Sequence, residues 1–409
     1  MAVFDAGDGP MLYVVGNFQA IIDPVFGEVR SPAIARWDGE RWLAVPGLDG
    51  AEFEPDARAI TLTVWDDGTG PALYVGGEFT TIAGLEAEGI ARFDASGWST
   101  LGEPTLGGVR GRVLAIHAHD FGDGEALYVG GEFVDRGTTE SAGGVQRWSG
   151  STWSPVGDDA PPKGGAVYGL ASFGGDLFAS GNYYLIGDEI GGRIARFDGV
   201  AWTRPVGPDQ ELFAADFWPM LPWTYEGRPV LAAGGRLTLL QGGEEIARDG
   251  VIVWDGQAWR PLSAVWETFH ATDLVVFDDG GGEALFAGGN FILSSNGVAK
   301  YQDGRFVPIR TSDMGVLDLL VFDAGSGPDL HSAGSFINPS RRAGSVARWA
   351  AEPLCRVDVN NDCTVDADDF AAFLVLFSRE NPRADMDRDG AFTLFDYLEF
   401  QNQFVAGCP

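Results

Sequence analysis

Oxygen-bearing residues stand at alternate positions in two stretches near the carboxyl end of the sequence, which is the spacing of a calcium-binding loop. At loop positions one, three, five, seven and twelve, the first stretch has Asp358, Asn360, Asp362, Thr364 and Asp369, and the second has Asp385, Asp387, Asp389, Ala391 and Asp396. Position seven contributes its backbone carbonyl, and the carboxylate at position twelve closes the shell from the start of a helix. The sequence therefore predicts two bound calcium ions.

The two loops differ at position six, where the sharp turn favours glycine. The second loop has Gly390 there and the first has Cys363, so the second is the better formed. An apolar run with helical spacing follows each loop, at 370–377 and at 397–404. Each loop is therefore expected to lead into one helix.

An aspartate at position twelve and a single helix after each loop resemble a dockerin more than a paired helix–loop–helix calcium-binding hand. Cys355 near the start and Gly407-Cys408 at the end add a similarity to the dockerin-like anchoring modules of secreted planctomycete proteins. The resemblance implies a small α-helical domain, 351–409, that binds a cohesin-like or other surface receptor and tethers its passenger to a cell surface or complex. It also implies an extracellular or cell-surface location, where Cys355 and Cys408 can form a disulfide and leave Cys363 free.

Residues 1–350 consist of repeats. A short apolar run that ends in glycine and an aromatic or apolar residue occurs seven times, starting at Leu12, Leu73, Leu127, Leu177, Val230, Leu285 and Asp329. The spacing of about 53 residues is typical of solenoids, propellers or arrays. A second run follows each copy, and in six repeats two aromatic residues stand five positions apart across a turn: Trp37/Trp42, Phe93/Trp98, Trp148/Trp153, Phe197/Trp202, Trp254/Trp259 and Tyr301/Phe306. The intervening residues favour hairpins.

A further strand-like run precedes each glycine run, so each repeat has four strands in an antiparallel meander. One such sheet cannot bury both faces, whereas radial stacking of several sheets can. We therefore predict an all-β domain over 1–350, a seven-bladed β-propeller of four-stranded antiparallel blades. Its last blade has three strands, because the final repeat stops at Trp349 without an outer strand. A glycine doublet followed by an aromatic residue and a later tryptophan resembles the kelch-type repeat, which indicates architecture but no ligand.

One hairpin of the fifth repeat is unusually aromatic, with Phe217, Trp218, Trp223 and Tyr225, and it has three prolines, Pro219, Pro222 and Pro229. Exposed rings would offer a stacking platform for sugars or a hydrophobic partner. The same rings could instead cap the core between blades. The loops between second and third strands vary most along the chain, and binding residues often gather in such loops. Ligand contact is therefore expected on the face that carries these loops, with the aromatic hairpin as the leading candidate.

Five glycine-rich acidic turns, which start at Phe4, Trp65, Phe121, Phe277 and Phe322, suggest metal binding at first sight. They have too few spaced oxygens for calcium, and aspartate commonly accepts bonds from its own turn. No GxSxG or HExxH motif is present, and His117 and His119 share a strand face without an obvious third ligand. The sequence names no catalytic residue, although a carboxylate pair for glycoside cleavage stays open.

A formal net charge of −32 argues against nucleic acid and anionic lipid as partners. No apolar run is long enough for membrane insertion. The first residues lack the features of a signal peptide and match the end of an inner strand. We therefore expect the natural chain to start further upstream or to have an export signal that this sequence lacks.

Together these features favour an exported, non-enzymatic binding or scaffold protein. Its propeller binds an unknown protein or glycan ligand, and its calcium-dependent tail anchors it. The alternative is a polysaccharide-active enzyme, a glycoside hydrolase or lyase, on the same scaffold. A structural component of a surface layer is a third possibility.

Overall fold

A computed structural model describes most of the chain. It describes residues 1–409 except 24–25, 49–56, 102–108, 136–143, 158–164, 184, 187–188, 191–192, 263–268, 292–294, 313, 325–326, 337–345, 350–356, 358–366, 379–383, 385, 387–392 and 407–409. The chain forms two compact units, one of Met1–Val276 with Ala284–Ala347, and one of Phe277–Glu283 with Arg348–Pro409.

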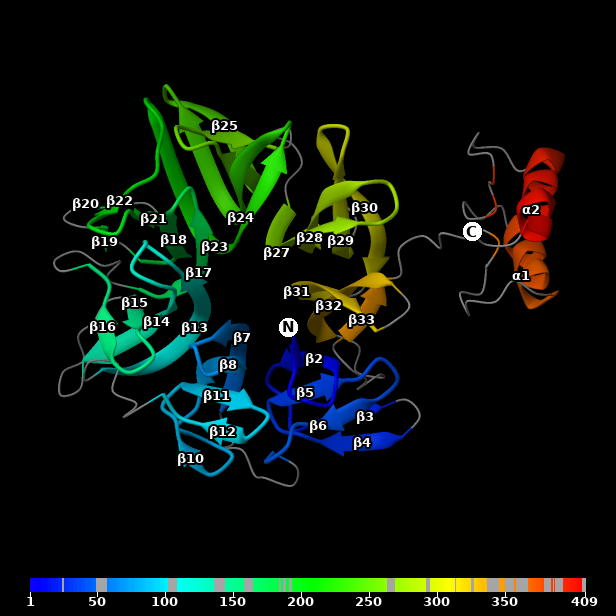
Figure 1. Cartoon of the computed structure of the whole chain (residues 1–409). Coiled ribbons are helices and arrows are strands. Elements are labelled where there is room, and N and C mark those ends of the chain that lie inside the picture. Colours follow the sequence, from blue (N-terminus) through cyan, green and yellow to red (C-terminus); the bar gives the residue numbers. More distant parts are fainter. Residues whose placement is uncertain are drawn as a thin grey trace. The chain divides into compact units, whose positions relative to one another are not determined.

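The larger unit has a β-propeller arrangement with six four-stranded antiparallel sheets, numbered here as blades 1 to 6 in chain order (Figure 1). The first strand of each blade lies towards the centre of the ring and the fourth lies at its rim. Blades 1 to 3 are β1 (Ala2–Asp5), β2 (Pro10–Val15), β5 (Ile34–Trp37) and β6 (Trp42–Ala44); β7 (Arg58–Asp66), β8 (Pro71–Glu78), β11 (Ile90–Asp94) and β12 (Gly97–Ser99); β13 (Val109–His119), β14 (Ala126–Asp135), β15 (Val145–Trp148) and β16 (Trp153–Pro155). Blades 4 to 6 are β17 (Val167–Phe173), β18 (Asp176–Gly181), β21 (Ile194–Phe197) and β22 (Trp202–Thr203); β23 (Gln210–Tyr225), β24 (Arg228–Gln241), β25 (Glu244–Trp254) and β26 (Trp259–Pro261); β27 (Phe269–Asp278), β28 (Glu283–Phe291), β29 (Ser295–Gln302) and β30 (Arg305–Ser312).

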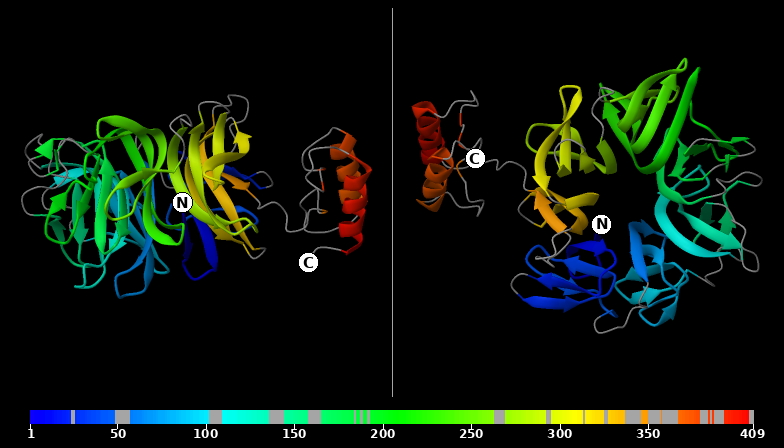
Figure 2. Two further views of the ribbon diagram at one scale, coloured as in Figure 1. Left: turned by 90° about the horizontal axis from the view of Figure 1, so that it is seen from above. Right: turned by 180° about the vertical axis from the view of Figure 1, so that it is seen from behind.

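A further sheet has three strands, β31 (Met314–Asp323), β32 (Pro328–Phe336) and β33 (Val346–Trp349), in that order. It is bonded to blade 6, because Thr272 Oγ1 donates to the Val316 carbonyl at 2.5 Å. Its Phe322 packs with Leu12 and Ala35 of blade 1. The three-stranded sheet therefore lies between blades 6 and 1, and the views in Figure 2 agree with this placement.

Among the described residues, three of the loops between second and third strands contain short hairpins of their own. They are β3 (Ala20–Asp23) with β4 (Gly27–Arg30), β9 (Thr81–Ile82) with β10 (Leu85–Glu86), and β19 (Leu185–Ile186) with β20 (Glu189–Ile190). The sequence did not predict these hairpins, because two-residue strands carry almost no periodic signal.

The recurrent glycine doublets face β-bulges in the inner strands. In blade 2 the register shifts between Ala59 and Thr61, which pair with Gly77 and Gly76. A Cβ on Gly77 would lie 2.1 Å from the Arg58 carbonyl oxygen, so no other residue fits against the bulge. The same register shift occurs in blades 3, 4 and 5 and in the three-stranded sheet.

The six predicted aromatic pairs are cross-strand neighbours in the third and fourth strands of the six blades. Their ring centroids lie 5.0 to 5.4 Å apart, within the range of favourable aromatic contact. Four outer tryptophans also donate their indole N–H to a carbonyl of the preceding blade: Trp98 to Pro46, Trp153 to Leu101, Trp202 to Val156 and Trp259 to Pro205. These bonds join blades 1 to 5 at the rim.

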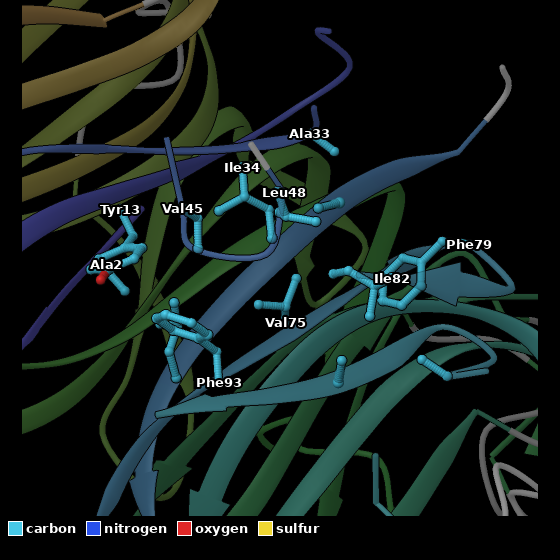
Figure 3. Close-up of a cluster of buried hydrophobic side chains, with 14 of the residues drawn as sticks. Ala2, Tyr13, Ala33, Ile34, Val45, Leu48, Val75, Phe79, Ile82 and Phe93 are labelled. Atoms are coloured by element: carbon cyan, nitrogen blue, oxygen red, sulfur yellow. The ribbon is translucent and has the colours of Figure 1, made fainter. Parts of the chain in front are cut away.

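Apolar side chains fill the space between neighbouring blades. Figure 3 shows the core between blades 1 and 2, where Tyr13 and Val45 of blade 1 lie near Val75 and Phe93 of blade 2. All four side chains are almost fully buried. Each blade thus buries both faces, which one sheet alone cannot do.

The indole bond at the rim gives the first prediction. Replacing Trp259 by phenylalanine keeps most of the ring but leaves the Pro205 carbonyl without its donor at 2.5 Å. We expect the free energy of unfolding to fall by about 1–3 kcal/mol, because a buried acceptor loses its partner. Trp259→Ala, which also removes a buried ring, should cost about 3–5 kcal/mol. Urea titration measures both, and an unchanged stability of Trp259→Phe would contradict the assigned role of the bond.

Candidate functional site

The smaller unit contains two helices, α1 (Ala367–Ser378) and α2 (Leu394–Ala406), where the sequence predicts a helix after each loop. Aromatic side chains hold them together. Phe373 of α1 and Phe400 of α2 are stacked, with ring centroids 4.0 Å apart and an interplanar angle of 11°. Val357, Ala384 and Met386 are buried in the same core.

Two carboxylates of this unit, Asp369 and Asp396, have no exposed surface. They are the position-twelve residues of the two predicted calcium loops. Asp396 Oδ1 accepts a hydrogen bond from the Met386 backbone N–H at 2.6 Å, and Oδ2 accepts one from Thr393 N–H at 2.8 Å. Thr393 Oγ1 in turn accepts from Phe395 N–H at 3.1 Å, so Thr393 and Asp396 together cap the start of α2. Asp396 thus ties the preceding loop to the helix.

The other predicted calcium ligands lie outside the described residues. They are Asp358, Asn360, Asp362, Thr364, Asp385, Asp387, Asp389 and Ala391. Cys355, Cys363 and Cys408 lie outside them as well, so the disulfide stays a prediction. In the part of the chain that the structure describes, no three histidine, cysteine or acidic side chains gather into a group that could hold a metal ion.

Helix α2 also exposes large apolar side chains beside the stripe of rings that it buries. Leu394 and Phe395 are 68% and 69% exposed, and Leu398 and Val405 are exposed too. Leu394, Leu398 and Val405 fall on one helical face, because they are separated by four and seven residues. On α1, Leu374 is also exposed. The four exposed residues of α2 are called the helical apolar face below.

In the predicted aromatic hairpin, two of the four rings are described. Trp223 and Tyr225 are half-buried and lie against Tyr301 of blade 6, with centroids 5.9 and 6.0 Å from its ring. The Tyr225 and Tyr301 hydroxyl groups are 3.3 Å apart. We call Trp223, Tyr225 and Tyr301 the aromatic cluster. Phe217 and Trp218 belong to β23, but their side chains lie outside the description.

The aromatic cluster is not on the face where the sequence placed the ligand contacts. Tyr225 pairs with Arg228 at the turn from β23 to β24, whereas Gln210 pairs with Gln241 beside the loop from β24 to β25. Trp223 and Tyr225 therefore lie at the end of the hairpin opposite to the variable loop. The alternation of side chains along a strand predicts which residues lie on the same side of the sheet. The end of the hairpin at which a residue lies depends instead on its position along β23, which alternation does not give.

The aspartates of the acidic glycine turns accept hydrogen bonds from the backbone of their own turns. The Oδ1 atoms of Asp5, Asp66, Asp120 and Asp278 each accept two backbone N–H groups, from the residues two and four positions later. Asp323 accepts one from Gly327. The geometry therefore supports a structural role for these aspartates rather than metal binding, as the residue types predicted.

Arginines of the third strands neutralise other acids in these turns. Arg36 pairs with Asp8 at 2.7 Å, and Arg147 pairs with Asp123 at 2.9 Å. In blade 2, burial together with the nearby Asp67 charge raises the pKa of the Tyr74 hydroxyl to about 12. This tyrosine therefore stays neutral across the physiological range.

Two histidines converge on a serine of the next blade. His117 Nε2 and His119 Nδ1 on β13 each lie 2.7 Å from Ser172 Oγ on β17. Burial lowers the pKa of His117 to about 4, and burial also lowers the pKa of His119. The sequence predicted that the two histidines share a strand face. It did not indicate the serine, which is far away in the sequence and meets the histidines only through blade packing.

Two carboxyl groups meet where β27 lies beside β31. Burial and the neighbouring Asp318 raise the pKa of Asp273 well above the usual carboxyl range. Asp273 Oδ2 accepts from Leu319 N–H at 2.6 Å, and the amino group of Met1 pairs with Asp318. Nothing in the sequence marks this pair, because the two residues belong to different repeats.

Comparison with known proteins gives no family. No family model matches the chain, and no curated protein matches it. Solved structures with similar arrangements include the extracellular domain of a hybrid two-component-system protein from B. thetaiotaomicron, with 13% identity, a TM-score of 0.44, and coverage of 82% of this chain and 38% of the other. An ancestral GH74 enzyme shows 13% identity, a TM-score of 0.46, and coverage of 86% of this chain and 50% of the other.

A sialidase of Trypanosoma rangeli is also similar, at 13% identity with a TM-score of 0.37, and 85% of this chain and 52% of the sialidase are covered. This chain thus spans about two fifths to half of the lengths of these three proteins. Within the described part of the chain, neither helix is long and apolar enough to cross a bilayer.

The histidine pair gives a pH prediction with a definite sign. The folded-state pKa of His117, about 4, lies below the value of 6.5 for an unperturbed histidine. The unfolded chain therefore binds more protons, and the stability that neutral His117 contributes above pH about 6.5 is lost as the pH falls towards about 4. In His117→Gln, the amide can still bond to Ser172 but does not titrate, so acid should lower the free energy of unfolding less than in the wild type. His270→Gln, in blade 6, is the control. Equal acid sensitivity of His117→Gln and the wild type would refute the prediction.

Proposed function

We propose that this protein is an exported, non-enzymatic binding or scaffold protein, in which a propeller displays a ligand site and a calcium-loaded tail anchors it. In this proposal the three-stranded sheet acts as a seventh blade, so residues 1–350 form one ring and residues 351–409 form a dockerin-like domain. The kelch-like sequence pattern of the repeats and the paired calcium loops support this proposal. The extracellular or cell-surface location follows from the similarity of the tail to secreted anchoring modules.

The observation that carries the calcium proposal is the complete burial of Asp369 and Asp396. Removal of a carboxylate from water costs several kcal/mol unless a partner offsets it. Each is the last ligand of a loop whose spacing suits calcium, and the tail has a large excess of acids over bases. A carboxylate has about four acceptor positions, so a metal ion can share Asp396 with its two backbone hydrogen bonds.

The helical apolar face is the proposed contact for the receptor of the tail. Exposed large apolar residues side by side on one helix are unusual unless a partner covers them. Leu394 and Phe395 stand next to the second calcium loop, so folding of that loop would fix their positions. A cohesin-like or other surface receptor would then bind only the calcium-loaded form.

The aromatic cluster is the proposed ligand contact of the propeller. Its three rings are half-buried. Two of them, Tyr225 and Tyr301, add hydroxyl groups that lie next to each other. This combination suits a glycan, whose sugar rings have apolar faces and hydroxyl edges. A protein loop with an exposed apolar residue is the other ligand that this surface fits.

A polysaccharide-active enzyme is the second candidate, since Asp273 and Asp318 are a carboxyl pair with one raised pKa. Glycosidases keep their two carboxyl groups about 5 Å or more apart, so that a sugar fits between them. Here Asp273 already accepts a hydrogen bond from Leu319 N–H, and Asp318 already pairs with the amino group of Met1. This pair therefore gives the enzyme little support, and a binding protein stays the proposal.

Calcium binding is tested on the full chain. Isothermal titration should show two sites, and Asp369→Asn and Asp396→Asn should each remove one. The control Asp303→Asn, in an exposed turn of blade 6, should keep both. At calcium about a hundredfold above its dissociation constant, each site should add roughly 2.7 kcal/mol to the stability of the tail. Asp385→Ala should weaken binding more than Asp358→Ala, because Gly390 makes its loop the better formed.

Removal of calcium by a chelator should affect the two units differently, which can be measured in the same experiment. Removal of calcium should abolish the helical circular dichroism signal and expose the tail to protease, while the β signal stays. The proposal fails if the chain takes up no calcium, or if chelation leaves the helices and their protease resistance unchanged.

Ligand binding by the propeller is tested with a glycan array and a matched pair of variants. Trp223→Ala removes a ring of the aromatic cluster, and Phe213→Ala removes an exposed ring elsewhere on β23. For a glycan bound at the cluster, we expect Trp223→Ala to weaken binding about threefold to tenfold, the effect of losing one aromatic contact. Phe213→Ala should bind as the wild type does. Equal binding by all three proteins would exclude the cluster, and release of reducing ends would favour the enzyme.

A further inference from the structure

The junction between blades 5 and 6 is built differently from the four junctions that precede it. In those four, an outer tryptophan donates its indole N–H to a carbonyl of the preceding blade. In blade 6 the outer position holds Phe306, whose ring pairs with Tyr301 as expected but has no N–H to donate. The contact between blades 5 and 6 therefore depends on other groups.

A pair of tyrosines crosses this junction. The hydroxyl oxygens of Tyr225 in blade 5 and Tyr301 in blade 6 are 3.3 Å apart, and their ring centroids are 6.0 Å apart at an interplanar angle of 69°. The ring of Trp223 lies 5.4 Å from Tyr225 and 5.9 Å from Tyr301, measured between centroids. The three rings form the partly buried edge of the apolar core that the two blades share.

Solvent reaches this pair, whereas several other tyrosines are sealed inside the protein. Tyr225 and Tyr301 are half-buried, and Tyr225 borders a turn whose residues Glu226 and Gly227 are exposed. Four tyrosines elsewhere in the chain are at most 2% exposed: Tyr13, Tyr74, Tyr128 and Tyr183. An oxidant in solution therefore meets the pair between blades 5 and 6 but not these four phenols.

The geometry of the pair suits the coupling of two phenoxyl radicals, which join through the ring carbons next to the hydroxyl-bearing carbons. Each of these carbons is one bond away from the carbon that carries the hydroxyl, so they lie near each other when the two oxygens do. Two directly bonded aromatic rings are twisted, because coplanar rings would press their neighbouring substituents together, and the angle of 69° is compatible with such a twist. The rings must still move closer, and rotation about the side-chain bonds of two half-buried residues provides this movement.

We propose that Tyr225 and Tyr301 form an oxidative modification site, at which a carbon–carbon bond joins blades 5 and 6. The oxidant is hydrogen peroxide, used by an enzyme of the haem peroxidase class. Each tyrosine loses one electron and one proton, and the two radicals couple. The hydrogen on each coupled carbon then moves to the oxygen of its ring, so both hydroxyl groups remain. The pair loses two hydrogen atoms in total, and one molecule of peroxide becomes two molecules of water.

The bond would hold the ring together at the junction where blade 6 offers no indole N–H. A cross-link between distant residues of one chain also restricts the unfolded state, as a disulfide does. The inference concerns two residues of the aromatic cluster, but it depends neither on a ligand bound there nor on calcium. Failure of the cross-link would therefore leave the proposed binding function untouched.

The full chain, dilute enough to limit coupling between molecules, is treated with hydrogen peroxide and a haem peroxidase, digested with a protease and analysed by mass spectrometry. We expect two peptides joined through Tyr225 and Tyr301, lighter than their sum by two hydrogen atoms. Tyr225→Phe keeps the ring but has no phenol to oxidise, so the joined peptides should be lost. The control Tyr168→Phe removes another half-buried tyrosine and should give as much product as the wild type.

Urea unfolding of the same samples tests what the bond does. The treated wild type should unfold at a higher urea concentration than the untreated protein, and treatment should not change the midpoint of Tyr225→Phe. Absence of the joined peptides, coupling of Tyr301 to another residue in Tyr225→Phe, or an unchanged midpoint of the cross-linked wild type would each overturn the proposal.

Discussion

The first glycine of each doublet sets the spacing of the ring. A Cβ on Gly76 would lie 2.6 Å from Val113 Cγ1, and one on Gly130 would lie 2.5 Å from Val167 Cγ1. In each case the valine belongs to the inner strand of the next blade. Any side chain at the glycine would push the next blade outwards, and it would break the indole bonds at the rim that depend on the same spacing. The rest of the propeller therefore depends on the close approach of inner strands.

The large negative charge has different physical meanings in the two units. In the propeller, the turn carboxylates accept N–H groups of their own turns, and third-strand arginines pair with several of their neighbours. Those acids need no ion. In the tail, Asp369 and Asp396 are completely buried beside a small core in which aromatic rings pack with Val357, Ala384 and Met386. Burial and spacing, rather than the number of acids, therefore support the proposed calcium sites.

Most of the fold was predictable from short-range patterns in the sequence. The aromatic pairs, the turn chemistry and the helices after the loops were predictable, because each depends on residues within about ten positions of one another. Contacts between repeats were not, since they depend on how one sheet lies on the next. The bonds from His117 and His119 to Ser172, and the Asp273–Asp318 pair, are of this kind. The end of the hairpin at which Trp223 and Tyr225 lie was not predictable either, because it depends on the register of β23 with β24, which periodicity does not give.

The indole bonds show where the ring is least supported. They link blades 1 to 5, but blade 6 has Phe306 at the outer position, and phenylalanine has no N–H to donate. The three-stranded sheet follows directly, beside the exposed Ile309 and the half-buried Trp37. A region with fewer buried contacts opens at lower free energy than the rest of a domain. The contact between blade 6 and the three-stranded sheet is therefore expected to open before the contacts between the blades that the indole bonds link.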